Sequence, residues 1–264
     1  MKPEDAWGAR WHNCAHPLSH EYMQLACEKE SLLVLAADLP TVDQIVELVE
    51  KVGDYVCALK THVDMVEGFS MESWFRVVQV ARSKKMLLFE DRKFADIGRV
   101  VQTQMGGLYD MRSWADLVTS HSVSGPDVVD GLGAAWEEVE RIGGVLLLAQ
   151  MSSSGNLLDG SYSDRTLSIG SSSPHVIGYI GNGSSGPELE SLRSKVGEGR
   201  MIWTPGVSLS AKEGVLGQRY GHPSEAVSSG SDAIIVGGGI HASEDPVSAA
   251  REYASKSWRA LLER

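Results

Sequence analysis

Short apolar runs alternate with amphipathic helical patterns from Leu32 to the end of this 264-residue chain. The runs are rich in leucine or β-branched residues and end in polar turns. They occupy residues 32–38, 55–62, 86–93, 114–122, 144–153, 176–181, 201–207 and 232–240. Between them lie segments with helical periodicity, such as 41–53, 125–143 and 245–264. Near-continuous apolar strands that alternate with helices indicate a parallel sheet covered by helices.

The number and spacing of these units predict an α/β fold of the (β/α)8 TIM barrel class. Eight strand–helix units in about 250 residues fit a closed barrel, whereas six would favour an open doubly wound sheet. We therefore expect a single barrel domain over residues 32–264, preceded by a helical extension over residues 1–31. The glycine- and serine-rich segment 152–175 is long for a barrel loop, and we expect a lid there.

Composition excludes several classes of function. The net charge is −11 and no lysine- or arginine-rich run occurs, so nucleic-acid binding is not expected. No stretch reaches the roughly 18 apolar residues that span a bilayer, so we expect no membrane segment. The polar N-terminus lacks the apolar core of a secretory signal. Cys14, Cys27 and Cys57 are odd in number and lack CxxC spacing, which is typical of free thiols in the cytoplasm.

Charged residues gather where the predicted strands end. In such a barrel the carboxyl ends of the strands carry catalytic side chains, while the opposite face serves stability. The candidates at these ends are Asp38, Lys60, His62, Asp91, Lys93 and Asp96. Asp91 and Lys93 are two residues apart on one strand, so both should project to one face, with Arg92 on the other.

An array of alternating charge is one way to place these groups together, because buried charges are costly unless paired. The predicted array contains Lys60, Asp91, Lys93 and Asp96. It could be a structural ion-pair cluster that plugs the barrel. Its place at the reactive end of the strands favours catalysis instead.

Four segments resemble signature segments of the orotidine 5′-monophosphate decarboxylase family, most strongly its fungal-type members. They are ALKTHVDM (58–65), LLFEDRKFADIG (87–98), TPGVSL (204–209) and LGQRY (216–220). The resemblance runs from about residue 12 to the C-terminus. A DxKxxD element that follows an LKTH strand is highly specific, whereas the element alone is a weak signal.

The resemblance implies roles for these residues. Lys93 resembles the proton donor to the carbanion left by CO2 loss, and Asp91 the carboxylate placed against the substrate carboxylate. Lys60 and Asp96 complete the array, and in the family the second aspartate reaches across a homodimer interface. Pro205 resembles the apolar wall beside the departing carboxylate. The resemblance also implies substrate contacts for Asp38, His62, Ser152, Gln218, Tyr220, Gly237 and Gly238.

Decarboxylation without a cofactor requires fixed charge in the active site. Loss of CO2 from a carbon with poor delocalisation leaves a basic anion, which a preplaced ammonium group can stabilise and then protonate. We therefore expect no metal and no organic cofactor. His62, His121 and His241 fall near strand ends, but no HxH spacing or bridging carboxylate supports a metal site.

Three positions depart from the family pattern. Gly238 stands where the eighth-strand motif normally has the arginine that grips the phosphate, Val100 where a threonine contacts ribose, and Ser154 where the lid has a lysine. Charge-assisted hydrogen bonds are worth roughly 1.5–3 kcal/mol each, so the missing arginine should weaken a phosphorylated ligand about tenfold to a hundredfold. Backbone N–H groups of Gly237–Gly239, or Arg219 or Arg165, could compensate.

The sequence is compatible with several functions. The leading prediction is a cofactor-independent carboxy-lyase for an altered, non-phosphorylated small carboxylate, with a role in secondary metabolism. The second is an authentic orotidine 5′-monophosphate decarboxylase with a rebuilt phosphate site. The others are an isomerase or cyclase that uses the array for proton transfer alone, and a non-catalytic binding protein.

Overall fold

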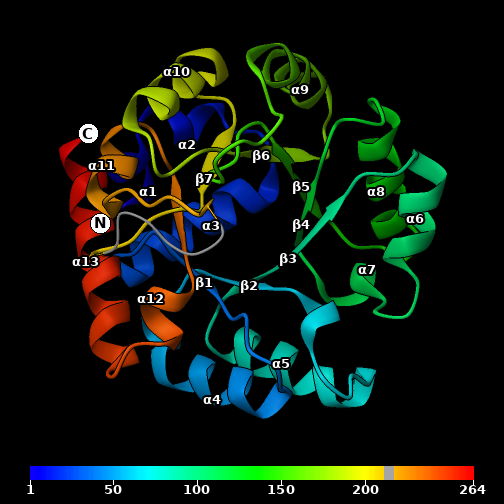
Figure 1. The fold of residues 1–264 in the computed structure, drawn as a ribbon, viewed down its shortest axis with the longest axis horizontal. Helices are drawn as coiled ribbons and strands as arrows, with labels where there is room; N and C mark the ends of the chain where they lie inside the picture. Colours follow the sequence, from blue (N-terminus) through cyan, green and yellow to red (C-terminus); the bar gives the residue numbers. More distant parts are fainter. Residues whose placement is uncertain (211–216) are drawn as a thin grey trace.

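The eight predicted strands close into a parallel barrel, as Figure 1 shows. The computed structural model describes residues 1–210 and 217–264. Strands that are consecutive in the sequence are neighbours, and β1 pairs with β8. They are β1 Leu33–Ala36, β2 Ala58–Thr61, β3 Leu87–Phe94, β4 Leu117–Ser120, β5 Gly144–Leu148, β6 Val176–Ile180, β7 Met201–Thr204 and β8 Ala233–Val236. Each strand overlaps one of the apolar runs, so the predicted (β/α)8 barrel is confirmed.

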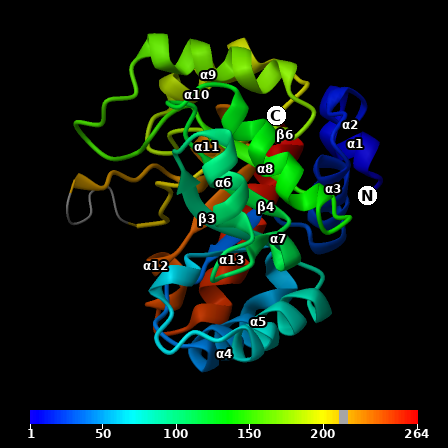
Figure 2. The same ribbon diagram turned by 90° about the vertical axis from the view of Figure 1, so that its right-hand side faces the viewer.

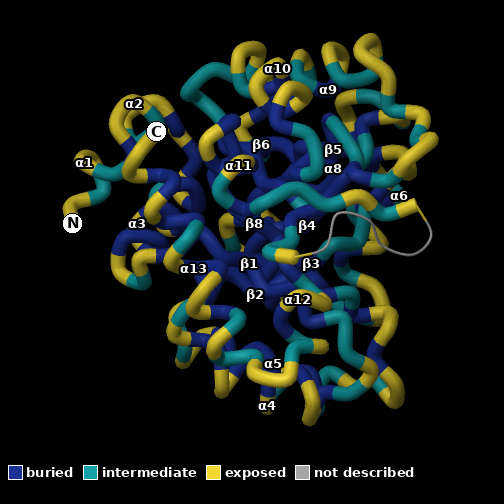
Figure 3. Tube along the Cα trace, turned by 60° about the vertical axis from the view of Figure 1, so that its left-hand side comes forward, coloured by how far each residue is buried: buried dark blue, intermediate teal, exposed yellow. Residues whose placement is uncertain are grey.

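Helices cover the outside of the barrel. They are α4 Val42–Val52, α5 Met71–Ser83, α6 Gly98–Met105, α7 Met111–Trp114, α8 Asp127–Glu137, α9 Gly160–Ser172, α10 Gly186–Val196, α11 Pro223–Ser228, α12 Gly238–His241 and α13 Pro246–Glu263, with short 3-10 turns η1 Gly53–Tyr55 and η2 Val63–Met65. Figure 3 shows burial concentrated in the strands, with exposed residues on the outer helices. Among the described residues, no helix has the length and apolar character needed to cross a membrane.

Helix α4 illustrates how the sequence specifies these elements. Thr41 caps its amino end by accepting a hydrogen bond from the Gln44 N–H at 3.3 Å. Its buried residues recur at helical spacing, so one face packs inward while the other stays in solvent. These buried residues are Val42, Ile45, Leu48, Val49 and Val52.

The N-terminal extension forms three helices, α1 Pro3–Trp7, α2 Ala9–Asn13 and α3 Pro17–Lys29. They lie on the side of the molecule opposite α12, which follows the carboxyl end of β8 (Figure 2). From α3, the Tyr22 hydroxyl donates to the carbonyl oxygens of Leu32 at 3.0 Å and Asp232 at 3.3 Å, just before β1 and β8. The extension therefore covers the amino ends of the strands and leaves their carboxyl ends accessible.

A buried ion cluster joins distant parts of the chain at this lower rim. The fully buried Asp232 carboxylate pairs with Arg10 Nε at 2.9 Å, with Arg264 at 3.2 Å and with Arg193. Burial opposes ionisation of Asp232, but the guanidinium groups outweigh it and lower its pKa. These ion pairs connect the N-terminal extension, α10 and the C-terminal residue to the amino end of β8.

The segment 152–175 differs from the expectation of one long loop, because it contains helix α9. Serine and glycine are weak helix formers, and this composition suggested a loop. The helix is nevertheless capped by Asp159, which accepts from the Tyr162 N–H at 2.8 Å. It is also held against β6 by Tyr179, whose hydroxyl donates to the Leu167 carbonyl at 3.0 Å. The connection from β5 is therefore residues 149–159, and its action as a lid stays a prediction.

Candidate active site

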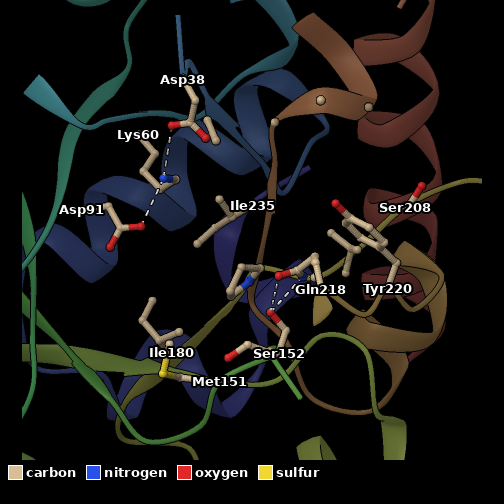
Figure 4. A pocket seen from close by; sticks show the side chains of 18 of the residues that line it. Asp38, Lys60, Asp91, Met151, Ser152, Ile180, Ser208, Gln218, Tyr220 and Ile235 are labelled. Atoms are coloured by element: carbon tan, nitrogen blue, oxygen red, sulfur yellow. Dashed lines mark hydrogen bonds and ion pairs between the residues drawn. The ribbon is translucent and has the colours of Figure 1, made fainter. Parts of the chain in front are cut away.

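A cavity of about 630 Å³ opens at the carboxyl ends of the strands. The side chains that follow several different strands converge on it (Figure 4). Ten of the twelve residues predicted from the sequence line it, namely Asp38, Lys60, Asp91, Lys93, Ser152, Pro205, Gln218, Tyr220, Gly237 and Gly238. His62 and Asp96 are the two that do not. The cavity therefore lies where a barrel enzyme holds its substrate.

Asp91 is the centre of the charged wall of this cavity. Its Oδ2 lies 3.1 Å from Lys60 Nζ, and its Oδ1 lies 2.8 Å from Lys93 Nζ. Lys60 Nζ also lies 3.7 Å from Asp38 Oδ1. The charges thus alternate in the order Lys93, Asp91, Lys60, Asp38. Each ion in this row has an opposite charge beside it, which offsets the cost of burial.

The second carboxylate of the row is Asp38, where the sequence analysis expected Asp96. The Asp96 side chain is exposed on the turn before α6, and its Oδ1 accepts from the Ile97 N–H at 2.7 Å. Asp96 follows β3 by only two residues, but the chain has already turned away from the barrel there. Within one chain, Asp96 is therefore not part of the array.

Strand β3 places Asp91 and Lys93 in the cavity by an irregular route. Regular alternation was expected from the sequence, but the β3–β4 register shifts between Glu90 and Phe94, and Lys93 has φ 50°. That left-handed conformation is uncommon outside glycine and marks local strain. Arg92 lies outside the cavity, with its guanidinium 5.8 Å from the centre of the Phe94 ring. The predicted facing of these residues is correct, although the backbone that produces it is a bulge.

His62 joins two carboxylates instead of lining the cavity as predicted. Its Nδ1 lies 2.8 Å from Asp38 Oδ1, and its Nε2 lies 3.4 Å from Asp91 Oδ2. Burial favours the neutral ring, but hydrogen bonds to Asp38 and Asp91 outweigh it and raise the pKa of His62 to about 9. His62 therefore carries a positive charge at neutral pH and holds both carboxylates in place.

Both carboxylates stay ionised near neutral pH. Burial alone raises the pKa of Asp38, but the hydrogen bond from His62 and the charge of Lys60 outweigh it and lower the pKa to about 2. Burial also opposes ionisation of Asp91, yet Lys60, His62 and Lys93 hold its pKa well below the usual range. Of the five charged groups joined here, three are cations and two are anions. This end of the cavity therefore suits an anionic ligand.

Two buried residues beside the array were not predicted from the sequence. Glu90 accepts hydrogen bonds from Thr61 Oγ1 at 2.7 Å and from the Val63 N–H at 2.9 Å, and burial raises its pKa to about 7. Thr119 on β4 donates to Asp91 Oδ1 at 2.8 Å. Glu90 and Asp91 are consecutive, so their side chains lie on opposite faces of β3. Glu90 binds Thr61 and Asp91 binds Lys60, and both of these partners are on β2. No sequence motif marks Thr119, because its role depends on the strand register.

The far side of the cavity is built from two loops that bind each other. Gln218 Nε2 donates to Ser152 Oγ at 3.0 Å, and the Ser154 N–H donates to the Gly217 carbonyl at 3.1 Å. Figure 4 shows Gln218 and Tyr220 across the cavity from Lys60 and Asp91. These hydrogen bonds join the loop after β5 to residues 217 and 218 of the segment before α11.

The region around Gly238 has room for a larger side chain, since a Cβ atom built there meets nothing within 4 Å. Of the described residues that line the cavity, only Lys60 and Lys93 have cationic side chains. Arg219 is exposed, and its Nε donates to the Ser152 carbonyl at 3.2 Å. Arg165 is exposed on α9 and is not part of the lining. Neither predicted substitute for the missing arginine is directed into the cavity.

The raised pKa of His62 predicts a pH-dependent stability. A histidine with a folded pKa of about 9 against 6.5 unfolded stabilises the fold fully below pH 6.5, and this contribution is lost as pH rises through 9. In urea unfolding, the free energy of unfolding of wild type should therefore fall by up to about 3 kcal/mol between pH 6.5 and pH 9, relative to that of His62→Asn. The exposed His12→Asn variant should follow wild type. Parallel curves for His62→Asn and wild type would contradict the assignment of His62 as an imidazolium.

Known proteins resemble this chain over nearly its whole length. A sequence model of the orotidine 5′-phosphate decarboxylase / HUMPS family matches residues 31–253. Orotidine 5′-phosphate decarboxylase of Candida dubliniensis is 38% identical over 265 residues, 98% of this chain and 96% of that protein. The Kluyveromyces marxianus protein of the same name is 40% identical over 253 residues, 94% of this chain and 92% of that protein.

A solved structure shows the same fold. The orotidine 5′-monophosphate decarboxylase of Methanocaldococcus jannaschii, complexed with the inhibitor BMP, superposes with a TM-score of 0.69 at 21% identity. The match covers 86% of this chain and 98% of the archaeal chain. The names of the fungal relatives support an enzyme, a decarboxylase of the lyase class. The chain belongs to the orotidine 5′-phosphate decarboxylase / HUMPS family.

Proposed function

We propose that this protein is a cofactor-independent carboxy-lyase that removes CO2 from a small cyclic carboxylate such as an orotate derivative. The observation that carries the proposal is Asp91, held between Lys60 and Lys93 at 3.1 and 2.8 Å on the wall of an open cavity. A structural ion cluster needs no cavity beside it. A decarboxylase without a cofactor can use this arrangement, because fixed charge of the protein stabilises the charge that develops on the substrate.

The proposed reaction uses this chain's own side chains throughout. The carbon–carbon bond to the carboxylate breaks, CO2 leaves, and the electron pair stays on the ring carbon. The Lys93 ammonium stabilises this carbanion and then donates its proton, which forms the new C–H bond. Lys93 is 37% exposed, so solvent can restore its proton afterwards. The apolar lining from Pro205, Val207 and Ile235 accommodates neutral CO2.

Asp91 has a second role in this proposal. An ionised carboxylate beside the substrate carboxylate raises the free energy of the bound substrate, and departure of CO2 relieves the repulsion. Lys60 and His62 keep Asp91 ionised, as its lowered pKa indicates. They also fix its orientation, since each contacts Oδ2 and leaves Oδ1 to Lys93 and Thr119.

We further propose that the substrate lacks the phosphate group. The support is Gly238 in place of the phosphate-gripping arginine, with neutral groups such as Tyr220 and Gln218 on that side of the cavity. Such a change of substrate suits a cytoplasmic enzyme of secondary metabolism. The alternative is orotidine 5′-monophosphate itself, which the names of the fungal relatives favour. In that case the backbone N–H groups of Gly237–Gly239 bind the phosphate.

A homodimer in which Asp96 enters the partner's site also remains a proposal. Asp96 is exposed, and the neighbouring Ile97 and Val123 are 59% and 69% exposed. Exposed apolar side chains near a carboxylate are suited to burial against another protein surface. Sedimentation equilibrium should give twice the 28.6 kDa chain mass. A fully active monomer would rule out a shared Asp96.

The substrate and the role of Lys93 are tested together. Purified protein is incubated with orotidine 5′-monophosphate, orotidine and orotate, each labelled in the carboxylate, and released CO2 is measured. We expect turnover of at least one unphosphorylated acid, and a loss of at least about a hundredfold in Lys93→Ala. The matched control is Lys256→Ala, which removes a half-exposed lysine on α13 that pairs with Glu252. Turnover of the nucleotide alone would establish the alternative substrate, and no CO2 from any acid would sink the decarboxylase proposal.

Restoring the arginine tests the phosphate site. Gly238→Arg should bind UMP about tenfold to a hundredfold more tightly than wild type, because a guanidinium adds charge-assisted hydrogen bonds and the position has room. Gly199→Arg adds the same charge far from the cavity and should leave the affinity unchanged. Isothermal titration calorimetry measures both. Equal affinities in wild type and Gly238→Arg would mean that another group already fills this role.

A further inference from the structure

Thr119 on β4 stands alone opposite a bulge in β3. Glu90 pairs with Val118 and Phe94 pairs with Ser120, so three residues of β3 lie against the single residue Thr119. Those three residues are 91–93, which include the central carboxylate and the candidate proton donor. A bulge of this kind bends its strand and redirects the side chains it carries. Thr119, which faces the bulge, can therefore influence the directions of the Asp91 and Lys93 side chains.

The Thr119 hydroxyl closes a ring of hydrogen bonds around Lys93. Its Oγ1 accepts from the Lys93 backbone N–H at 2.8 Å and donates to Asp91 Oδ1 at 2.8 Å. The same Asp91 oxygen lies 2.8 Å from Lys93 Nζ. One hydroxyl thus links the main chain of Lys93, the Asp91 carboxylate and, through that carboxylate, the Lys93 ammonium.

Each part of this ring meets a physical need. The bulge removes the Lys93 N–H from the regular strand ladder, and a buried N–H without a partner is costly. Lys93 also has φ 50°, a conformation that persists only where its surroundings hold it. Thr119 is 1% exposed, so no solvent replaces its hydroxyl. Its β-branched side chain has few rotamers, which keeps the hydroxyl aimed at both partners.

We propose that Thr119 is a positioning residue of the active site, whose hydroxyl holds the β3 bulge and sets Asp91 and Lys93 Nζ in register with the cavity. Thr119 itself is not part of the cavity lining, so it acts through these two residues. A hydroxyl is suited to this place because it accepts and donates at once. Valine has the same shape but can do neither.

The test compares Thr119→Val with Thr119→Ser, which keeps the hydroxyl. The matched control is Thr166→Val on α9, another fully buried threonine whose hydroxyl lies 2.6 Å from Ser122 Oγ, away from the array. Hydrogen exchange of the Lys93 amide and the kinetics of CO2 release are measured in all variants. The kinetic readout rests on the proposed function, whereas the exchange readout does not.

We expect Thr119→Val to speed exchange of the Lys93 amide by about tenfold or more and to lower kcat about tenfold to a hundredfold, with KM changed less than about threefold. Thr119→Ser should restore both, and Thr166→Val should alter neither. Unchanged exchange at Lys93 in Thr119→Val would overturn the proposal, as would equal losses of kcat in the two valine variants. If no acid releases CO2 even with wild type, the decarboxylase proposal fails, and the exchange data alone decide the role of Thr119.

Discussion

The structure of the candidate active site depends on one carboxylate, Asp91, shared between two ammonium groups. Removing water from an ion is costly, and Asp91 is tolerated at this depth because Lys60, Lys93 and His62 surround it. Each of these cations is in turn held by Asp91. The carboxylate therefore fixes the position of the ammonium group that faces the cavity, and a fixed charge is more effective than a mobile one in stabilising a developing anion.

The two ends of the barrel use the same ionic chemistry for different purposes. At the lower rim, Asp232 is fully buried among three arginines and sealed by the N-terminal helices. At the upper rim, the ion pairs of Asp91 face a cavity of about 630 Å³. A sealed cluster can only join chain segments, whereas an open one can exchange a ligand or a proton. The contrast explains why charge at the carboxyl ends of the strands indicates function here.

Much of the fold and of the site follows from the sequence. Eight apolar runs predict the barrel, and the polar residues at the strand ends identify Lys60, Asp91 and Lys93 as candidates. Local patterns could not predict the bulge in β3, because a register shift is settled by the partner strand. For the same reason Thr119 was not predicted. Asp38 takes the place expected for Asp96 in the row of one chain, because the backbone turns away from the barrel after β3. Helix α9 was not predicted, because stabilisation from its N-cap and its packing outweighs the low helix propensity of its serine-rich sequence.

Binding of a charged ring tests the central claim most directly. One ligand is a uridine with an ionised hydroxyl at the ring carbon that bears the carboxylate in orotidine, and the other is uridine itself. If Asp91 holds Lys93 against a developing carbanion, calorimetry should show wild type binding the anionic ring at least about a hundredfold more tightly than uridine. This preference should largely disappear in Lys93→Ala. Equal affinities for both ligands in wild type, or an unchanged preference without Lys93, would contradict the account.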